Sequence, residues 1–285
     1  MKYLQLFFLL ILTSTCLGSS RVVEPVPNKI SETKKSVEDT IIEKIVIVEK
    51  KLADTINNEL IKKLTLDTIQ INSFDHSIWN NLLQKYVSAE GNVNYKTFKT
   101  DRNLLLQYLF SLGENIPHED WTKHEKLAFW INAYNAMTID LILRHYPIKS
   151  IKDIKDPWEQ RYWKLGDKWY NLEEIEHQIL RKMNEPRIHF AIVCASYSCP
   201  KLLNETYKAE TLENQLTEVT EEFLNDKKRN NISQNRLELS KIFQWFSKDF
   251  KQDGNIIDFI NQYSQIQISE KAKIIYMDYN WGLNE

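Results

Sequence analysis

The feature that most constrains the fold is a long apolar helix, predicted over residues 123–145. Thr122 and Glu125 have the spacing of a capping box, which starts a helix, and Pro147 follows its end. Large apolar side chains cover nearly every side of a helical wheel drawn for this segment: Leu127, Phe129, Trp130, Ile131, Met137 and Ile142. Because a helix that is apolar all round is a buried one, we expect a globular domain built around it.

Two asparagines interrupt the apolar surface of this helix. Asn132 and Asn135 are three residues apart, so they share one strip of the helix. Each buried polar group left without a partner costs about 1–3 kcal/mol. We therefore expect polar groups to face this strip, which makes both asparagines candidate binding residues.

The rest of the chain mixes helical and strand patterns. Helices are predicted at residues 78–86, 98–112, 172–183, 212–224 and 240–250, and strands at 91–95, 187–194 and 273–277, with a hairpin turn at Gly166-Asp167. Helices outnumber strands and their order is irregular. This pattern predicts an α+β (or irregular α/β) fold, in which residues 73–285 form one helix-rich domain with a small mixed sheet, preceded by a long N-terminal helix.

The first 18 residues have the pattern of a cleavable signal peptide. Lys2 precedes an apolar run from Leu4 to Leu12, which is too short to span a bilayer, and Gly18 ends a plausible cleavage site. We expect an exported protein, secreted or lumenal in the secretory pathway, or periplasmic in a bacterium. In a eukaryotic route, the sequons at Asn204 and Asn231 would add glycosylation.

Residues 19–72 combine a leader with a charged helical segment. Pro25 and Pro27 indicate an irregular leader, and residues 31–64 carry apolar positions at near-heptad spacing: Ile41, Ile45, Val48 and Leu52. The segment is either an amphipathic helix that packs on the main domain or a short coiled coil through which the chain associates with itself.

The charge balance excludes one class of partner. The formal net charge is −2, and the sequence has no concentrated basic stretch of the kind that nucleic-acid partners require. It also has no glycine-rich phosphate loop and no acidic calcium loop. We predict no cofactor, no metal and no membrane span after signal cleavage.

Glu176 is the most unusual residue of the predicted 172–183 helix, because it falls on the apolar face. A carboxylate aimed into a core must be paired, hydrogen-bonded, protonated or in contact with a cavity. Arg187 and His189 are the nearest polar candidates and share one face of the predicted 187–194 strand. Either Glu176 forms a buried ion pair with Arg187, or Glu176, His177, His189 and the asparagine strip converge on a pocket.

Two cysteines, Cys194 and Cys199, remain after signal cleavage. In an oxidising compartment a disulfide between them is the default. A catalytic thiol is an alternative, since Cys199 precedes Pro200 and so suits the first turn of a helix, with His177 or His189 as its base. Two free structural thiols, or a zinc site made by these two cysteines and two histidines, are the other options.

Three dense motifs resemble one protein family. They are residues 127–136 (LAFWINAYNA), 175–181 (IEHQILR) and 186–200 (PRIHFAIVCASYSCP), with weaker markers at 91–95 and 281–284. Together they resemble the domain-of-unknown-function 547 family over roughly residues 79–284. The resemblance implies no reaction, because none is established for that family, and it favours a coiled coil before the domain, as in some relatives.

These patterns favour a binding or interaction domain for a small polar ligand or a protein partner. Its polar pocket would be built from the Glu176-His177 helix and from the strand and loop between Arg187 and Cys199. The predicted binding residues are Asn132, Asn135, Arg187 and Ser196. The alternative is a thiol-dependent hydrolase or acyl transferase that uses Cys199 or Cys194 with His177 or His189, assisted by Glu176.

Overall fold

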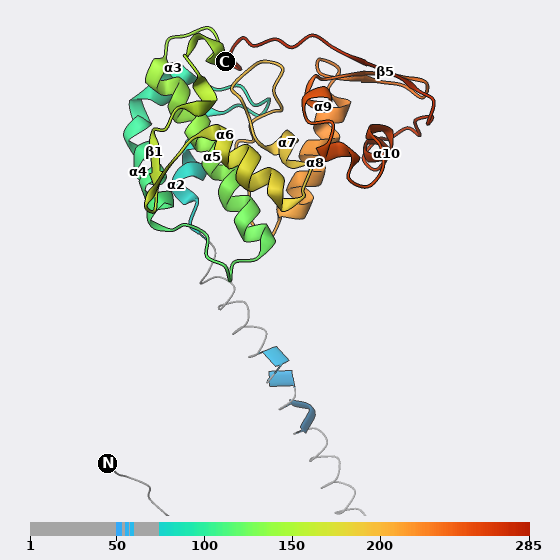
Figure 1. The fold of residues 1–285 in the computed structure, drawn as a ribbon. Coiled ribbons are helices and arrows are strands. Elements are labelled where there is room, and N and C mark those ends of the chain that lie inside the picture. Colours follow the sequence, from blue (N-terminus) through green and yellow to red (C-terminus); the bar gives the residue numbers. More distant parts are fainter. Residues whose placement is uncertain (1–49, 53–54, 57, 60–73) are drawn as a thin grey trace, which may run out of the picture. The chain divides into compact units, whose positions relative to one another are not determined.

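The computed structural model describes residues 50–52, 55–56, 58–59 and 74–285, and Figure 1 shows the fold. The chain divides into two compact units, residues 1–67 and 68–285. The predicted signal peptide, leader and most of the 31–64 segment lie outside the described residues, so these stay predictions. The few residues described before 60 are helical.

Helix α5 (Lys123–His145) runs through the centre of the second unit (Figure 1). The predicted capping box is confirmed: the Glu125 N–H donates to Thr122 Oγ1, and the Thr122 N–H donates to the Glu125 carboxylate. Every residue from Leu127 to Leu143 is buried, as the all-round apolar pattern predicted. The helix therefore forms the axis of the hydrophobic core.

Helices from the first half of this unit pack around α5. They are α2 (Ser77–Tyr86), α3 (Tyr95–Phe98), α4 (Arg102–Glu114) and α6 (Leu172–Glu174). The predicted hairpin is confirmed as β1 (Trp163–Leu165) and β2 (Lys168–Tyr170), joined at Gly166 with φ of 56°. A positive φ is a conformation that glycine adopts without steric cost, which explains the residue at this turn.

The second half supplies the small mixed sheet. Strands β3 (Asn231–Ile232) and β4 (Arg236–Leu239) pair antiparallel, and β4 pairs parallel with β5 (Lys273–Tyr276). Three helices accompany it: α8 (Leu212–Asn225), α9 (Ile242–Trp245) and α10 (Ile256–Asn261). The predicted α+β class is confirmed. Within the described residues, no helix combines the length and apolarity needed to cross a bilayer.

The strand predicted at residues 187–194 is wrong. Residues Ile188–Ala191 form the short helix α7, whose first turn is closed by N–H groups that donate to the carbonyls of Glu185 and Pro186. A short, fully buried apolar run fits a helix as well as a strand, and periodicity alone cannot separate the two. As a result Arg187 and His189 do not share a face.

The C-terminal tail ties three distant segments together. Gly282 and Leu283 form isolated bridges with Ser150 and Ser196, and the Val93 N–H donates to the Asn284 carbonyl. The Asn284 side chain also accepts a hydrogen bond from Tyr95 Oη at 2.7 Å. The two weak edge motifs of the sequence, 91–95 and 281–284, therefore meet, and the tail holds the loop that carries both cysteines.

Candidate functional site

A pocket of about 180 Å³ lies beside the cysteine loop. Five residues singled out from the sequence line it together: Glu176, His177, His189, Cys194 and Cys199. Its remaining wall is mainly aromatic and comes from distant parts of the chain: Tyr134, Trp158, Trp245, Phe246, Tyr279 and Trp281. The structure thus gathers the predicted acid, imidazoles and thiols around one space.

The backbone that enters this loop is fixed by Asn135. Its Nδ2 donates to the Ala191 carbonyl at 2.9 Å, and its Oδ1 accepts the Val193 N–H at 3.0 Å. Asn132 binds the loop at Tyr207 in the same way: its Nδ2 donates to the Tyr207 carbonyl, and its Oδ1 accepts the Tyr207 N–H. Both buried amides have the polar partners that we predicted, but those partners are backbone groups and neither side chain lines the pocket.

Cys194 follows directly, and its sulfur is surrounded by hydrogen-bonding groups. Cys194 Sγ lies 2.9 Å from Cys199 Sγ, 3.0 Å from Ser196 Oγ and 3.1 Å from Tyr279 Oη. The hydrogen bond from Cys199, with those from Ser196 and Tyr279, lowers the pKa of Cys194 to about 7 in spite of burial. Donors aimed at one sulfur favour its thiolate form.

The residue after Cys194 has a constrained backbone. Ala195 is fully buried and has a φ of 56°, in the left-handed region, where an L-residue pays roughly 1–2 kcal/mol of strain. The Asn284 N–H donates to its carbonyl at 3.2 Å. Strained residues of this kind cluster at functional sites, where surrounding contacts hold them in place.

The pKa of Cys199 is shifted in the opposite direction to that of Cys194. It is buried, its Sγ accepts the Cys194 N–H at 2.8 Å, and burial raises the pKa of its thiol well above the usual value. The predicted helix start at Pro200 is wrong, because the chain is irregular from there to residue 211, so no helix terminus activates this thiol. Both cysteines are free thiols in the structure, and the disulfide stays a prediction.

Glu176 points into the core, as its position on the apolar face predicted. It lies on a π-helical turn, Ile175–Ile179, a local geometry that often occurs at functional sites. Tyr134 Oη donates to Glu176 Oε2 at 3.1 Å, and burial raises the pKa of Glu176 to about 7. Near neutral pH this carboxyl group can both donate and accept a proton.

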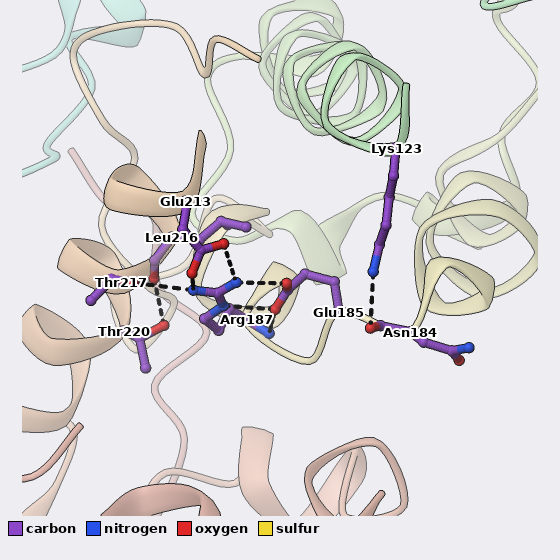
Figure 2. A network of polar contacts seen from close by, with 8 residues as sticks. All are labelled: Lys123, Asn184, Glu185, Arg187, Glu213, Leu216, Thr217 and Thr220. Atoms are coloured by element: carbon purple, nitrogen blue, oxygen red, sulfur yellow. Dashed lines mark hydrogen bonds and ion pairs between the residues drawn. The ribbon is translucent and has the colours of Figure 1, made fainter. Parts of the chain in front are cut away.

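The predicted ion pair between Glu176 and Arg187 is wrong. Figure 2 shows that the Arg187 guanidinium instead bonds to Glu185 and Glu213, with a further contact to Thr217. These bonds join the start of α7 to α8. Because α7 is a helix and not a strand, Arg187 turns away from the residues that line the pocket.

A cluster of charged groups lies at the histidine side of the pocket. Asp249 accepts from Arg181 Nε at 2.6 Å, from Arg181 Nη2 at 2.8 Å and from His189 Nε2 at 2.8 Å. Burial alone would raise the pKa of Asp249, but these bonds hold that pKa well below its usual range. No local pattern in the sequence indicates this pairing, since Asp249 is distant along the chain from Arg181 and His189.

Burial lowers the pKa of His177 and of His189, which favours the neutral form of both imidazoles. Arg181 Nη1 lies 2.8 Å from His177 Nδ1, and because arginine can only donate, His177 carries its proton on Nε2. His189 donates through Nε2 to Asp249. In the described part of the chain its buried Nδ1 has no partner, and neither imidazole is hydrogen-bonded to a sulfur.

The remaining predicted residues lie outside the pocket lining. Ser196 is buried, and its Oγ lies 3.0 Å from Tyr279 Oη, so the hydroxyls of both residues lie next to Cys194 Sγ. Asn204 and Asn231 are exposed. The zinc alternative lacks support, since no group of three or more His, Cys, Asp or Glu residues among those described is arranged to hold a metal ion.

Residues 118–224 match the model of a family described as "Protein of unknown function, DUF547". This segment of the chain is therefore similar to an uncharacterised domain family. The matched residues include α5, the π-helical turn with Glu176, and the loop with both cysteines. Asp249 and the C-terminal aromatic residues of the pocket follow the DUF547 match. Comparison with curated proteins and with solved structures found no match.

Proposed function

We propose that this chain is a thiol-dependent hydrolase or acyl transferase in which Cys194 is the nucleophile. The observation that carries the proposal is the setting of Cys194 Sγ, which borders a pocket and contacts three hydrogen-bonding groups within 3.1 Å. A cysteine activated in this way needs no adjacent imidazole to form the thiolate.

In the first step, the Cys194 thiolate attacks the carbonyl carbon of an ester, thioester or amide. A C–S bond forms, the bond to the leaving group breaks, and the leaving group takes a proton from the Glu176 carboxyl. Glu176 suits this role because it lines the same pocket and the charge of Cys194 helps to keep it protonated. The products are an acyl-enzyme and the protonated leaving group.

In the second step, water or an acceptor with a hydroxyl, thiol or amine group attacks the acyl-enzyme. Its proton passes to the Glu176 carboxylate, the new acyl bond forms, and the C–S bond breaks to release the Cys194 thiolate. The cycle therefore restores both groups. Near pH 7 the thiolate and the protonated carboxyl are both populated, since each has a pKa of about 7.

A binding domain is the second candidate, and the aromatic wall of the pocket favours it. Trp245 is 45% exposed and stacks on Trp281 with ring centroids 5.7 Å apart, so it offers a surface to a ligand. However, Asn132, Asn135 and Arg187 are engaged inside the fold. Because these three predicted binding residues are occupied, few groups remain in the pocket to recognise a polar ligand. The activated thiol of Cys194 is therefore a more distinctive feature than the aromatic wall.

Alkylation of the folded protein tests the proposal. The reduced full chain is treated with iodoacetamide at pH 7.5 and digested, and the cysteine-containing peptide is mapped by mass spectrometry. We expect modification at Cys194 and none at the buried Cys199 until the protein unfolds. Cys194→Ser should abolish the labelling of the folded chain, and Cys199→Ser should retain it. An unmodified Cys194 in folded protein would leave the binding domain as the better proposal.

We also propose that the chain is exported and begins at Ser19 after cleavage. The support is the pattern of the first 18 residues and the exposure of Asn204 and Asn231. Expression in a eukaryotic secretory host, followed by mass analysis before and after removal of N-glycans, tests this. An intact N-terminus at Met1 in protein recovered from the cells, with none in the medium, would contradict it.

A further inference from the structure

We infer that the pocket beside Cys194 accepts an uncharged acyl group whose apolar end is about the size of a benzene ring. This inference rests on the proposed function, because it names the substrate class of the same site. It follows from the volume of the pocket, the composition of its walls and the pairing of the charges around it.

The volume of the pocket sets the size of the group. It measures about 180 Å³, and an apolar cavity of about 150 Å³ is known to hold one benzene molecule. The pocket therefore has room for a single ring, or for a branched acyl chain of similar volume, beside the reacting carbonyl. A longer chain would have to extend past Trp245, the pocket residue that is most exposed at 45%.

The walls favour an apolar group. Ile192, Val193 and Ile242 supply aliphatic surface, and Phe246 and Trp281 add aromatic faces. Tyr279 and Trp281 lie with ring centroids 4.6 Å apart, so they form a continuous aromatic wall. Rings gain about 0.5–1.5 kcal/mol from such packing beyond the burial of their area.

The charges disfavour an anionic group. Neither lysine nor arginine is among the described residues that line the pocket. The nearby Arg181 does not line the pocket, and its Nε, Nη1 and Nη2 already donate to Asp249 and His177, so its charge is paired inside the fold. A carboxylate placed here would approach Glu176 and the Cys194 thiolate without a counter-ion, which is costly in a buried site.

A cationic group is also disfavoured. It would meet Glu176, but that carboxyl is buried, accepts a hydrogen bond from Tyr134 and shares its surroundings with the positive charge of Arg181. Most of the remaining surface is apolar and offers a cation no replacement for its water shell. An uncharged acyl group avoids both costs.

Four chloroacetamides of matched reactivity test the inference on the full chain. They are chloroacetamide itself, N-benzyl chloroacetamide, and two N-benzyl forms with a para carboxylate or a para aminomethyl group. Each reacts by the same step: the Cys194 thiolate forms an S–C bond and chloride leaves with the electron pair of the C–Cl bond. Rates at Cys194 are divided by the rates with glutathione, which removes differences in intrinsic reactivity.

We expect N-benzyl chloroacetamide to react at least 10-fold faster than chloroacetamide, and at least 10-fold faster than either charged form, differences of about 1.4 kcal/mol each. Trp245→Ala should reduce the ratio of benzyl to parent rates several-fold. Trp169→Ala is the matched control, because Trp169 is 52% exposed and does not line the pocket, and it should keep the ratio of the unmodified chain.

The outcomes separate the two claims. If chloroacetamide reacts but the benzyl group gives no advantage, or if a charged form reacts fastest, the substrate class is wrong while the reactive thiol stands. If no probe modifies Cys194 in the folded chain, the proposed function itself fails.

Discussion

At the scale of single residues, the chemistry of the site depends on how hydrogen bonds and burial shift the pKa of neighbouring side chains. Cys194 and Cys199 are close, yet the pKa of Cys194 is lowered by the donors that converge on it, while burial raises the pKa of Cys199. Glu176 has a raised pKa because the effect of burial exceeds that of its hydrogen bond from Tyr134, which lowers the pKa. These differences support the proposed roles of Cys194 as the nucleophile and Glu176 as the acid.

Removing one donor should weaken the thiolate. Tyr279→Phe deletes the hydroxyl 3.1 Å from Cys194 Sγ, so we expect the pKa of Cys194 to rise and its alkylation at pH 7 to slow several-fold. The measurement is the rate of iodoacetamide labelling between pH 6 and 9. Tyr197→Phe is the control, since Tyr197 is 43% exposed and lies outside the pocket. Equal profiles for the two variants would contradict the role of Tyr279.

Burial of Glu176 should make stability depend on pH. Its folded pKa of about 7 is above the unfolded value, so its contribution to folding is favourable at low pH and is lost as the pH rises toward 7. The full loss corresponds to about 3 kcal/mol. Denaturant unfolding at pH 5 and pH 8 should show Glu176→Gln gaining stability relative to the unmodified chain at the higher pH.

The neighbouring Glu173 supplies the control for that experiment. It is exposed, so Glu173→Gln should change stability by a similar small amount at both pH values. A Glu176→Gln variant that behaves in the same way would show that the buried carboxyl is not protonated near neutral pH.

At the scale of elements, the sequence predicted the long features well and the short ones poorly. The capping box, the buried course of α5 and the hairpin at Gly166 followed from local patterns. Helix α7 did not follow from a local pattern, because a buried run of four residues has no diagnostic period. The conformation of this segment is set by tertiary contacts such as the hydrogen bond from Asn135 to the Ala191 carbonyl. The partners of Arg187 were wrong for the same reason.

Removal of the Asn135 side-chain amide and removal of the Asn132 side-chain amide should have different effects on Cys194. Asn135→Ala leaves the Ala191 carbonyl and the Val193 N–H without partners, so we expect a loss of about 2–4 kcal/mol and a raised pKa of Cys194 as the loop loosens. Asn132→Ala should lose similar stability, but it frees the Tyr207 loop instead. Urea unfolding and the rate of Cys194 labelling are measured for both variants. An equal change of the labelling rate in the two variants would contradict this prediction.

At the scale of the whole molecule, the pocket depends on contacts between segments far apart in the sequence. Glu176, Cys194 and Trp281 line one pocket although they come from the Ile175–Ile179 turn, the cysteine loop and the C-terminal tail, and Asp249 reaches this site through its bond to His189. The sequence identified the inward acid, both histidines and both thiols as one site, because they lie within 25 residues of each other. It could not identify Asp249 or the aromatic wall, which carry no local signal.

Deleting residues 279–285 should therefore damage the site more than the fold. The deletion removes a donor to Cys194, two pocket walls and the bonds from Asn284 to two segments. We expect helical circular dichroism close to that of the full chain, a lower melting temperature and loss of preferential Cys194 labelling. Deletion of Glu285 alone, whose side chain is exposed and is hydrogen-bonded only to Tyr146 among the described residues, should change none of these.

The central claim is that neighbouring donors make Cys194 a thiolate near neutral pH. The pH dependence of its alkylation in the folded, reduced full chain measures this directly, with the modified residue identified by mass spectrometry. The account predicts a midpoint near pH 7. A midpoint of about 8.5, the value of an ordinary cysteine, or the absence of reaction until the protein unfolds, would contradict it.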